Sequence, residues 1–349
     1  TMKKMKWLAL LLVAVMALAA AGCGGGASTP PAEEPDSGTD APAEPPAEPA
    51  KVAILIPSSP TDGGWGQVGA DGLRYVAEGL GIEPVIVEAG TADLMREEAE
   101  ALAAEGYDVI FGHGGQYASP FGEISGDYPD TLFVTAGGSV VTDNQMPLEF
   151  VLERMTYIQG VMAANLTETN KLGMVIGGEF PAYTKTSRAF ELGAKSVNPD
   201  IEVLLGVTQD SSDMNEGYEL SLSQVQAGAD VLFTNANQAT QGSVAAARET
   251  ETWIFAAVRD ISAEAPDQAV STAAQDFGPA MLATAQSWID GTLEGGSAII
   301  IDDKSGGIFW VWNDNVKDKL PAEVVGLYEE LLPKVMSGEI NVPRENEGW

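Results

Sequence analysis

"KVAILIPSSPTDGGWGQVGADGLRYVAEGL", residues 51–80, places a continuous apolar run ahead of a glycine-rich segment and a run with helical periodicity. A short continuous run of branched apolar residues is typical of a strand that is buried on both faces of a parallel sheet. The order strand, glycine-rich loop and helix predicts the first half of a strand-helix-strand unit. Trp65 lies where the loop meets the helix. Its ring either anchors the helix to the core, on one apolar face with Val68 and Leu73, or forms one wall of a binding site.

The same alternation recurs in two successive runs along the chain. The first run of predicted strands comprises "KVAILIP" (51–57), "EPVIVEA" (83–89), "YDVIFGHG" (107–114) and "DTLFVTAGG" (130–138). The second run follows a predicted helix around Glu153 to Leu166 and comprises "KLGMVIGG" (171–178), "IEVLLGV" (201–207), "ADVLFTN" (229–235) and "TWIFAAV" (252–258). Segments of helical composition that close with glycine or proline separate these strands. The pattern predicts an α/β protein with two lobes, each a doubly wound parallel sheet.

The segments that follow the predicted strands share a composition rich in Gly, Asn, Gln, Asp and aromatic residues. They read "PSSPTDGGW", "GHGGQY", "AGGSVVTDN", "GGEFPAY", "TNANQATQG" and "VRDIS". Ligands of open α/β sheets bind beyond the carboxyl ends of the strands. Glycine lets the backbone approach a ligand, and side-chain amides offer both a donor and an acceptor. The sequence therefore predicts a small-molecule site at these ends, and Trp65 lies beside it.

Motifs of catalysis are absent from the sequence. It contains no G-x-x-x-x-G-K-[ST], no G-x-S-x-G and no H-E-x-x-H, and His113 is its single histidine. A serine triad or a zinc site would depend on that one residue, so neither an enzyme nor a metal protein is predicted, and no cofactor is expected. His113 has two interpretations: a half-buried residue satisfied by the backbone of a glycine turn, or a polar contact to a ligand.

The first fifty residues have the organisation of an export signal and a linker. Lys3, Lys4 and Lys6 precede an apolar stretch, Trp7 to Ala21, that is too short for a typical membrane-spanning helix of about 20 residues. "AAGC", ending at Cys23, resembles the lipobox of bacterial lipoproteins. That resemblance implies removal of a signal peptide at 1–22 and acylation of Cys23. Residues 23–50, rich in Pro, Ala and Glu, then form a disordered linker between the lipid anchor and the folded chain.

Acidic residues dominate the charge of the chain. Its formal net charge is −33, from 51 Asp and Glu against 18 Lys and Arg. So negative a surface repels phosphate backbones and anionic lipids, which excludes nucleic acid as a partner and leaves the lipid anchor as the expected membrane contact. The predicted location is the extracytoplasmic face of the cell membrane, and the predicted state is a monomer.

From Lys51 to the end, the chain resembles the basic membrane protein (BMP, PnrA-like) family of ABC-transporter substrate-binding lipoproteins. The resemblance is carried by "PTDGGWGQVGADG", "ERMTYIQGVMAA", "LGMVIGGEFPAYTKTSRAFELGAKSVNPDIEV" and "VMSGEINVP", in this order. It implies a type I periplasmic-binding-protein fold, with two lobes joined by three crossovers. Lobe 1 would comprise 51–150 plus 274–300, and lobe 2 would comprise 151–273 plus 301–349. It also implies a purine nucleoside or nucleobase in the cleft between the lobes and an ABC permease as partner.

The resemblance also implies the site. Trp65 and Phe180 occupy the places of two aromatic residues that stack on the base, and Asp62 is the acidic residue of the first loop. Two positions depart from nucleoside-binding members: Asp260 stands one place later than the usual aspartate, and Gln275 stands where lysine is common. The remaining candidates for polar contacts to the ligand are His113, Gln116 and Asn237.

The departures leave the choice between nucleoside and free base open. A sugar-binding receptor of the same fold, or a surface sensor without a transport role, remains an alternative. Hinge segments are expected near 149–153, 275–276 and 301–304.

Overall fold

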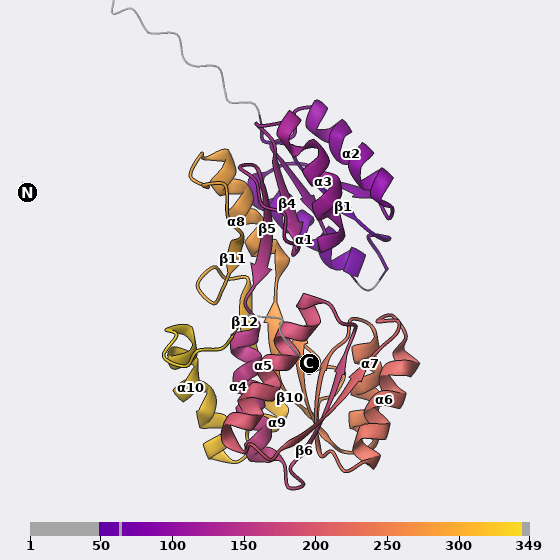
Figure 1. The fold of residues 1–349 in the computed structure, drawn as a ribbon, viewed down its shortest axis with the longest axis vertical. Coiled ribbons are helices and arrows are strands. Elements are labelled where there is room, and N and C mark those ends of the chain that lie inside the picture. The colour runs from indigo at the N-terminus through magenta and orange to yellow at the C-terminus, as the bar shows by residue number, and fades with distance from the viewer. Residues whose placement is uncertain (1–48, 63–64, 344–349) are drawn as a thin grey trace, which may run out of the picture. The chain divides into compact units, whose positions relative to one another are not determined.

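The computed structural model describes residues 49–62 and 65–343, which form two six-stranded sheets (Figure 1). The predicted export signal, Cys23 and residues 24–48 of the predicted linker lie outside the described residues. The first sheet, sheet A, has the strand order β11-β5-β4-β3-β1-β2, and the second, sheet B, has the order β12-β10-β9-β8-β6-β7.

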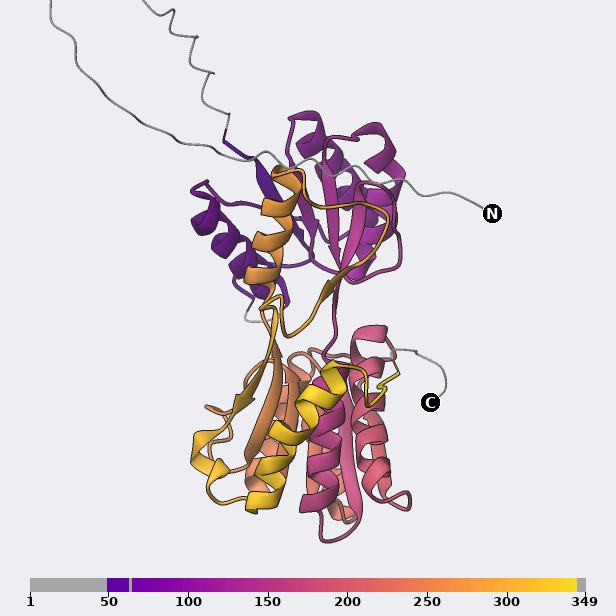
Figure 2. The same ribbon diagram turned by 90° about the vertical axis from the view of Figure 1, so that its left-hand side faces the viewer.

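The strands of sheet A are all parallel. They are β1 (Val52–Ile56), β2 (Val85–Glu88), β3 (Val109–Gly112), β4 (Leu132–Ala136), β5 (Gln145–Phe150) and β11 (Ile299–Ile301). Helices α1 (Trp65–Leu80) and α8 (Phe277–Ile289) pack on one face, and α2 (Ala92–Ala104) and α3 (Ala118–Ile124) pack on the other. Short 3-10 helices η1 (Gly115–Tyr117) and η2 (Ser125–Asp127) flank α3. Figure 2 shows α8, in orange, among the indigo and magenta elements of sheet A, far from them in sequence.

Sheet B has five parallel strands and one antiparallel strand, β12. Its strands are β6 (Lys171–Ile176), β7 (Glu202–Val207), β8 (Val231–Asn235), β9 (Trp253–Val258), β10 (Ala269–Gln275) and β12 (Ile308–Trp312). One face is covered by α4 (Glu153–Leu166), α5 (Pro181–Val197) and α10 (Ala322–Met336), and the other by α6 (Met214–Gln226) and α7 (Ala239–Glu249). Helix α9 (Asp314–Lys317) follows β12.

Burial on both faces explains the continuous apolar runs of the strands. In β1, for example, all five residues are buried: Val52, Ile54 and Ile56 face the core under α1 and α8, whereas Ala53 and Leu55 face the core under α2 and α3. The predicted fold class, two doubly wound α/β lobes, is confirmed. The helix predicted around Glu153 to Leu166 also has these bounds in the structure.

The chain passes between the two sheets three times. The passages lie between β5 and α4, between β10 and α8, and between β11 and β12. Backbone hydrogen bonds tie them together: Val151 N donates to Ile301 O at 3.0 Å, and Asp276 N donates to Gly307 O at 2.8 Å. The three crossover segments, 151–152, 276 and 302–307, therefore form one bonded group rather than three independent linkers.

Candidate functional site

The carboxyl ends of β1 and β3 bring Asp62, Trp65 and His113 to one edge of sheet A. The Asp62 carboxylate accepts hydrogen bonds from Gly66 N at 3.2 Å and Gln67 N at 3.0 Å. It thus provides an acceptor for N–H groups in the first turn of α1, which have none within the helix. A carboxylate there also interacts favourably with the helix dipole. Asp62 thus stabilises the amino end of α1, whose first residue is Trp65.

Trp65 is half-buried, and its indole is fixed by two neighbours. Nε1 donates to the His113 carbonyl oxygen at 2.9 Å, and the indole stacks on the His113 imidazole with the ring centroids 4.0 Å apart. The Phe277 ring meets Trp65 edge-on at a centroid distance of 5.5 Å. One face of the indole is therefore occupied by protein, and its orientation is set before any ligand arrives.

His113 is almost fully enclosed, with 1% of its surface exposed. Gly69 makes this possible, because a Cβ at that position would lie 2.6 Å from His113 Cγ. Burial lowers the pKa of His113 from its ordinary 6.5 to about 3, against the opposing effects of a hydrogen bond with the Trp65 backbone and of the nearby Asp62 carboxylate. The imidazole is therefore neutral at physiological pH, and among the described residues its Nε2 has no hydrogen-bond partner.

This buried histidine predicts a pH dependence of stability. Between about pH 6.5 and pH 3 the unfolded chain binds a proton at His113 that the folded chain does not bind, so the free energy of unfolding falls as the pH falls. The slope is about 1.4 kcal/mol per pH unit once the unfolded-state histidine is charged. Urea unfolding at pH 5.5 and 4.5 should show this extra loss in the wild type relative to His113→Gln, which lacks the titrating group. Equal losses in the two proteins would contradict the buried neutral imidazole.

Gln116 lies three positions beyond His113, in η1, and is exposed. Its side chain lies over Gly114, where a Cβ would be 2.1 Å from Gln116 Oε1. Gly114 has φ +142°, a conformation that residues with a Cβ rarely adopt. The glycine turn after β3 thus leaves room for the amide at the surface of the same edge.

Three other predicted residues follow strands of sheet B and so lie at the edge of a different sheet. Phe180, with 66% of its surface exposed, precedes α5, and its ring lies over Gly178. Asn237 follows β8, is exposed and has φ +49°. Asp260 follows β9, and its carboxylate accepts from Ser262 N at 2.9 Å and Ser262 Oγ at 2.7 Å. An exposed ring of this size at the carboxyl end of a parallel sheet is available to a ligand.

Gln275 differs from both groups, because it is the last residue of β10 and lies next to the second crossover. It is half-buried and pairs with Ile308 of β12. Gln275 therefore lies in the β10–β12 pairing, at the point where the second crossover segment begins and the third ends.

A strained turn at the end of β9 was not predicted from the sequence. Val258 has φ +79°, and Arg259 N donates to Ala257 O at 3.1 Å across it, which is the hydrogen bond of a γ-turn. Positive φ is a true outlier for a β-branched residue, and such strain concentrates at functional sites. Its side chain packs against the cores of both sheets, so the turn lies where the two cores meet.

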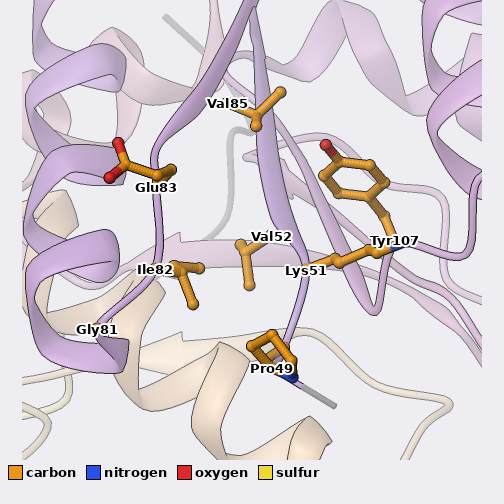
Figure 3. A pocket seen from close by; sticks show the side chains of 9 residues that line it. Pro49, Lys51, Val52, Gly81, Ile82, Glu83, Val85 and Tyr107 are labelled. Carbon is orange, nitrogen blue, oxygen red and sulfur yellow. The ribbon is translucent and has the colours of Figure 1, made fainter.

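The pocket of Figure 3 lies elsewhere. Its volume is about 560 Å³, and its lining includes Lys51, Val52, Ile82 and Tyr107. These residues lie at or just before the amino ends of β1, β2 and β3, opposite the edge that carries Trp65. Within residues 49–62 and 65–343, no group of three or more His, Cys, Asp or Glu could hold a metal ion, and no helix is long and apolar enough to cross a membrane.

Two doubly wound lobes joined by three crossovers, with polar and aromatic loops at the carboxyl ends of the strands, have the fold of periplasmic-type binding proteins. A solved ABC-transporter solute-binding protein from Conexibacter woesei has this fold, with a TM-score of 0.67 and 21% identity over 84% of this chain and 99% of its own. Residues 50–346 match the family described as ABC transporter substrate-binding protein PnrA-like. The chain belongs to this Bmp family, and it is a solute-binding protein of an ABC transporter rather than an enzyme.

Two relatives align with most of this chain. The transcriptional activator protein Med of Bacillus subtilis is 27% identical, over 70% of this chain and 77% of its own. A purine-binding protein of Brucella abortus is 25% identical, over 83% of this chain and 82% of its own.

Proposed function

We propose that this solute-binding protein binds a purine, as the free base or the nucleoside, between its two lobes. The observation that carries the proposal is the fixed Trp65 indole: one face is stacked on His113, and the ring is half-buried at the carboxyl edge of sheet A. A preoriented aromatic ring favours a flat heterocycle, because little side-chain entropy is lost when the base stacks. The relative described as purine-binding supports the same ligand class.

In this proposal the second stacking ring is Phe180. Its ring is exposed, so removal of this apolar surface from water by a ligand favours binding. Gln116, Asn237, Asp260 and Gln275 supply hydrogen bonds to the edge of the base or to a ribose. Asp62 and His113 act mainly by holding Trp65, since the Asp62 oxygens cap α1 and the His113 ring is buried.

Ligand binding closes the lobes about the crossover segments, and the closed protein docks on an ABC permease. The proposed lobes are 51–150 plus 274–300 and 151–273 plus 301–349, and the proposed state is a monomer without cofactor. Acylation at Cys23 would hold it at the extracytoplasmic face of the membrane. Mass spectrometry of the protein isolated from membranes tests the anchor, since an unmodified Cys23 would exclude it.

A thermal-shift screen tests the ligand class. We expect adenine, guanine, adenosine or guanosine to raise the melting temperature, because a ligand that binds only the folded state adds about 2.7 kcal/mol at a hundredfold excess over its Kd. Ribose, galactose and pyrimidines serve as controls. A shift with a sugar and none with purines would replace the purine assignment by a sugar receptor of the same fold.

A second role, as a ligand sensor without transport, has one observation in its favour: a relative of this chain is described as a transcriptional activator. Uptake of labelled purine by cells that lack the gene separates the two roles. Unchanged uptake would favour sensing, and reduced uptake favours transport.

A further inference from the structure

A series of aromatic ring contacts leads from Trp65 toward the crossover segments, and Phe277 is at its centre. The Phe277 ring lies 5.5 Å from Trp65, 4.8 Å from His113 and 4.5 Å from Phe150, measured between centroids. Phe277 itself is 3% exposed. These distances lie within the range in which aromatic pairs interact beyond simple burial.

Phe277 and Phe150, the two phenylalanines in this series of ring contacts, each lie beside a crossover segment. Phe277 begins α8 directly after Asp276, whose backbone N–H donates to Gly307 O in the third crossover segment. Phe150 ends β5, immediately before Val151 of the first crossover segment. The Phe150–Phe277 pair therefore directly adjoins the first and second crossover segments in sequence.

The third crossover segment also packs closely here. A Cβ at Gly307 would lie 2.2 Å from Ile301 Cγ2 and 3.4 Å from Phe150 Cε1. A side chain there would have to displace Ile301, and the Phe150 ring lies at van der Waals distance from the place that its Cβ would take. Phe150 and Phe277 each adjoin a crossover segment through one peptide bond, and close-packed interiors transmit displacement.

We propose that Phe277 is a positioning residue that couples the orientation of the Trp65 ring to the crossover segments. This inference rests on the proposed function for its ligand, but not for its geometry. When the crossover segments rearrange, Phe277 moves with α8 and with Phe150, and the edge it presents to Trp65 moves too. Coupling is reciprocal, so a ligand stacked on Trp65 stabilises one arrangement of the crossover segments.

The first test needs no ligand. The Trp65 indole N–H is hydrogen-bonded to His113 O, and its NMR signal is identified by its loss in Trp65→Phe. We expect Phe277→Leu and Phe150→Leu each to accelerate solvent exchange of this indole N–H by about 2- to 10-fold. This range is the interaction free energy of one aromatic pair, converted to a ratio of equilibrium constants. Phe133→Leu is the matched control: Phe133, like Phe277, is almost fully buried against sheet A, but in the core on the other face, beneath α2 and α3.

The second test uses the purine that gives the largest thermal shift. Phe277→Leu and Phe150→Leu should raise its Kd by about the same 2- to 10-fold, and Phe133→Leu should leave it unchanged although it also lowers stability. If Phe150→Leu changes neither exchange nor Kd, coupling to the crossover segments is wrong. If Phe277→Leu also matches the control, Phe277 has no positioning role. If the wild type binds no purine, the proposed ligand is wrong, and the exchange measurement still decides the role of Phe277.

Discussion

Trp65→Ala should weaken purine binding by about 5- to 150-fold, the largest effect on affinity that we expect from a single substitution. Stacking of one base on an aromatic side chain contributes about 1–3 kcal/mol, and this range converts to that loss of affinity. Alanine removes the indole that His113 and Phe277 hold in place, and the His113 ring centroid lies 4.0 Å behind that of the lost indole. Isothermal titration with the purine that gives the largest thermal shift measures the change.

Trp288→Ala is the control for this experiment. Trp288 is also a partly buried tryptophan packed on the core under α1 and α8, but it lies in the last turn of α8. Both substitutions remove an indole from the same core, so both should lower stability. A loss of affinity of similar size in the two variants would mean that Trp65 acts on the fold and not on the ligand.

Gly160→Ala should lower the free energy of unfolding by about 2–3 kcal/mol, because α4 and α5 cross in backbone contact. A Cβ at Gly160 would lie only 1.9 Å from Phe190 O, and a Cβ at Gly193 would lie 2.0 Å from Tyr157 O. Backbone atoms cannot turn aside as a flexible side chain can, so the helices must separate. The cost exceeds the gain in helix propensity of about 1 kcal/mol that alanine brings. Urea unfolding measures the difference.

Gly326→Ala in α10 is the matched control. Gly326 also lies inside a helix, but apart from its chain neighbours and the adjacent backbone of α10, no atom of the described residues lies within 4 Å of the Cβ that alanine would add. This substitution should therefore stabilise the protein by about 0.4–1 kcal/mol, through the lower entropy of the unfolded chain. Opposite signs for the two substitutions support the close crossing of α4 and α5, and stabilisation by both would refute it.

Local sequence patterns were sufficient to predict most of sheet A and sheet B. Strands such as β1 and β6 are continuous apolar runs, because each is buried on both faces, and that requirement is visible in the sequence. Helix α4 was predicted with its observed bounds. Four strands were not predicted. Strands β5 (QMPLEF) and β10 (AVSTAAQ) mix polar and small residues with apolar ones, and the pairing of β11 with β5 and of β12 with β10 depends on partners distant in the chain.

The candidate site was predictable as a location but not as a set of contacts. Loops at the carboxyl ends of parallel strands converge on one edge of a sheet, so Asp62, Trp65 and His113 could be placed together. Whether His113 faces a ligand or the interior could not be decided from "GHGGQ". The structure shows it buried against Gly69 and stacked on Trp65, a pairing of residues 48 positions apart.

The sequence by itself determined the alternation of strands and helices, the two lobes, and the composition of the edge where a ligand would bind. Each of these follows from periodicity and turn chemistry within short windows. Only the tertiary structure decided the orientation of the Trp65 ring, the position of Phe277 between it and the crossover segments, and the strained turn at Val258. These features depend on side chains from distant segments competing for the same space, and close packing resolves that competition only when the whole chain is folded.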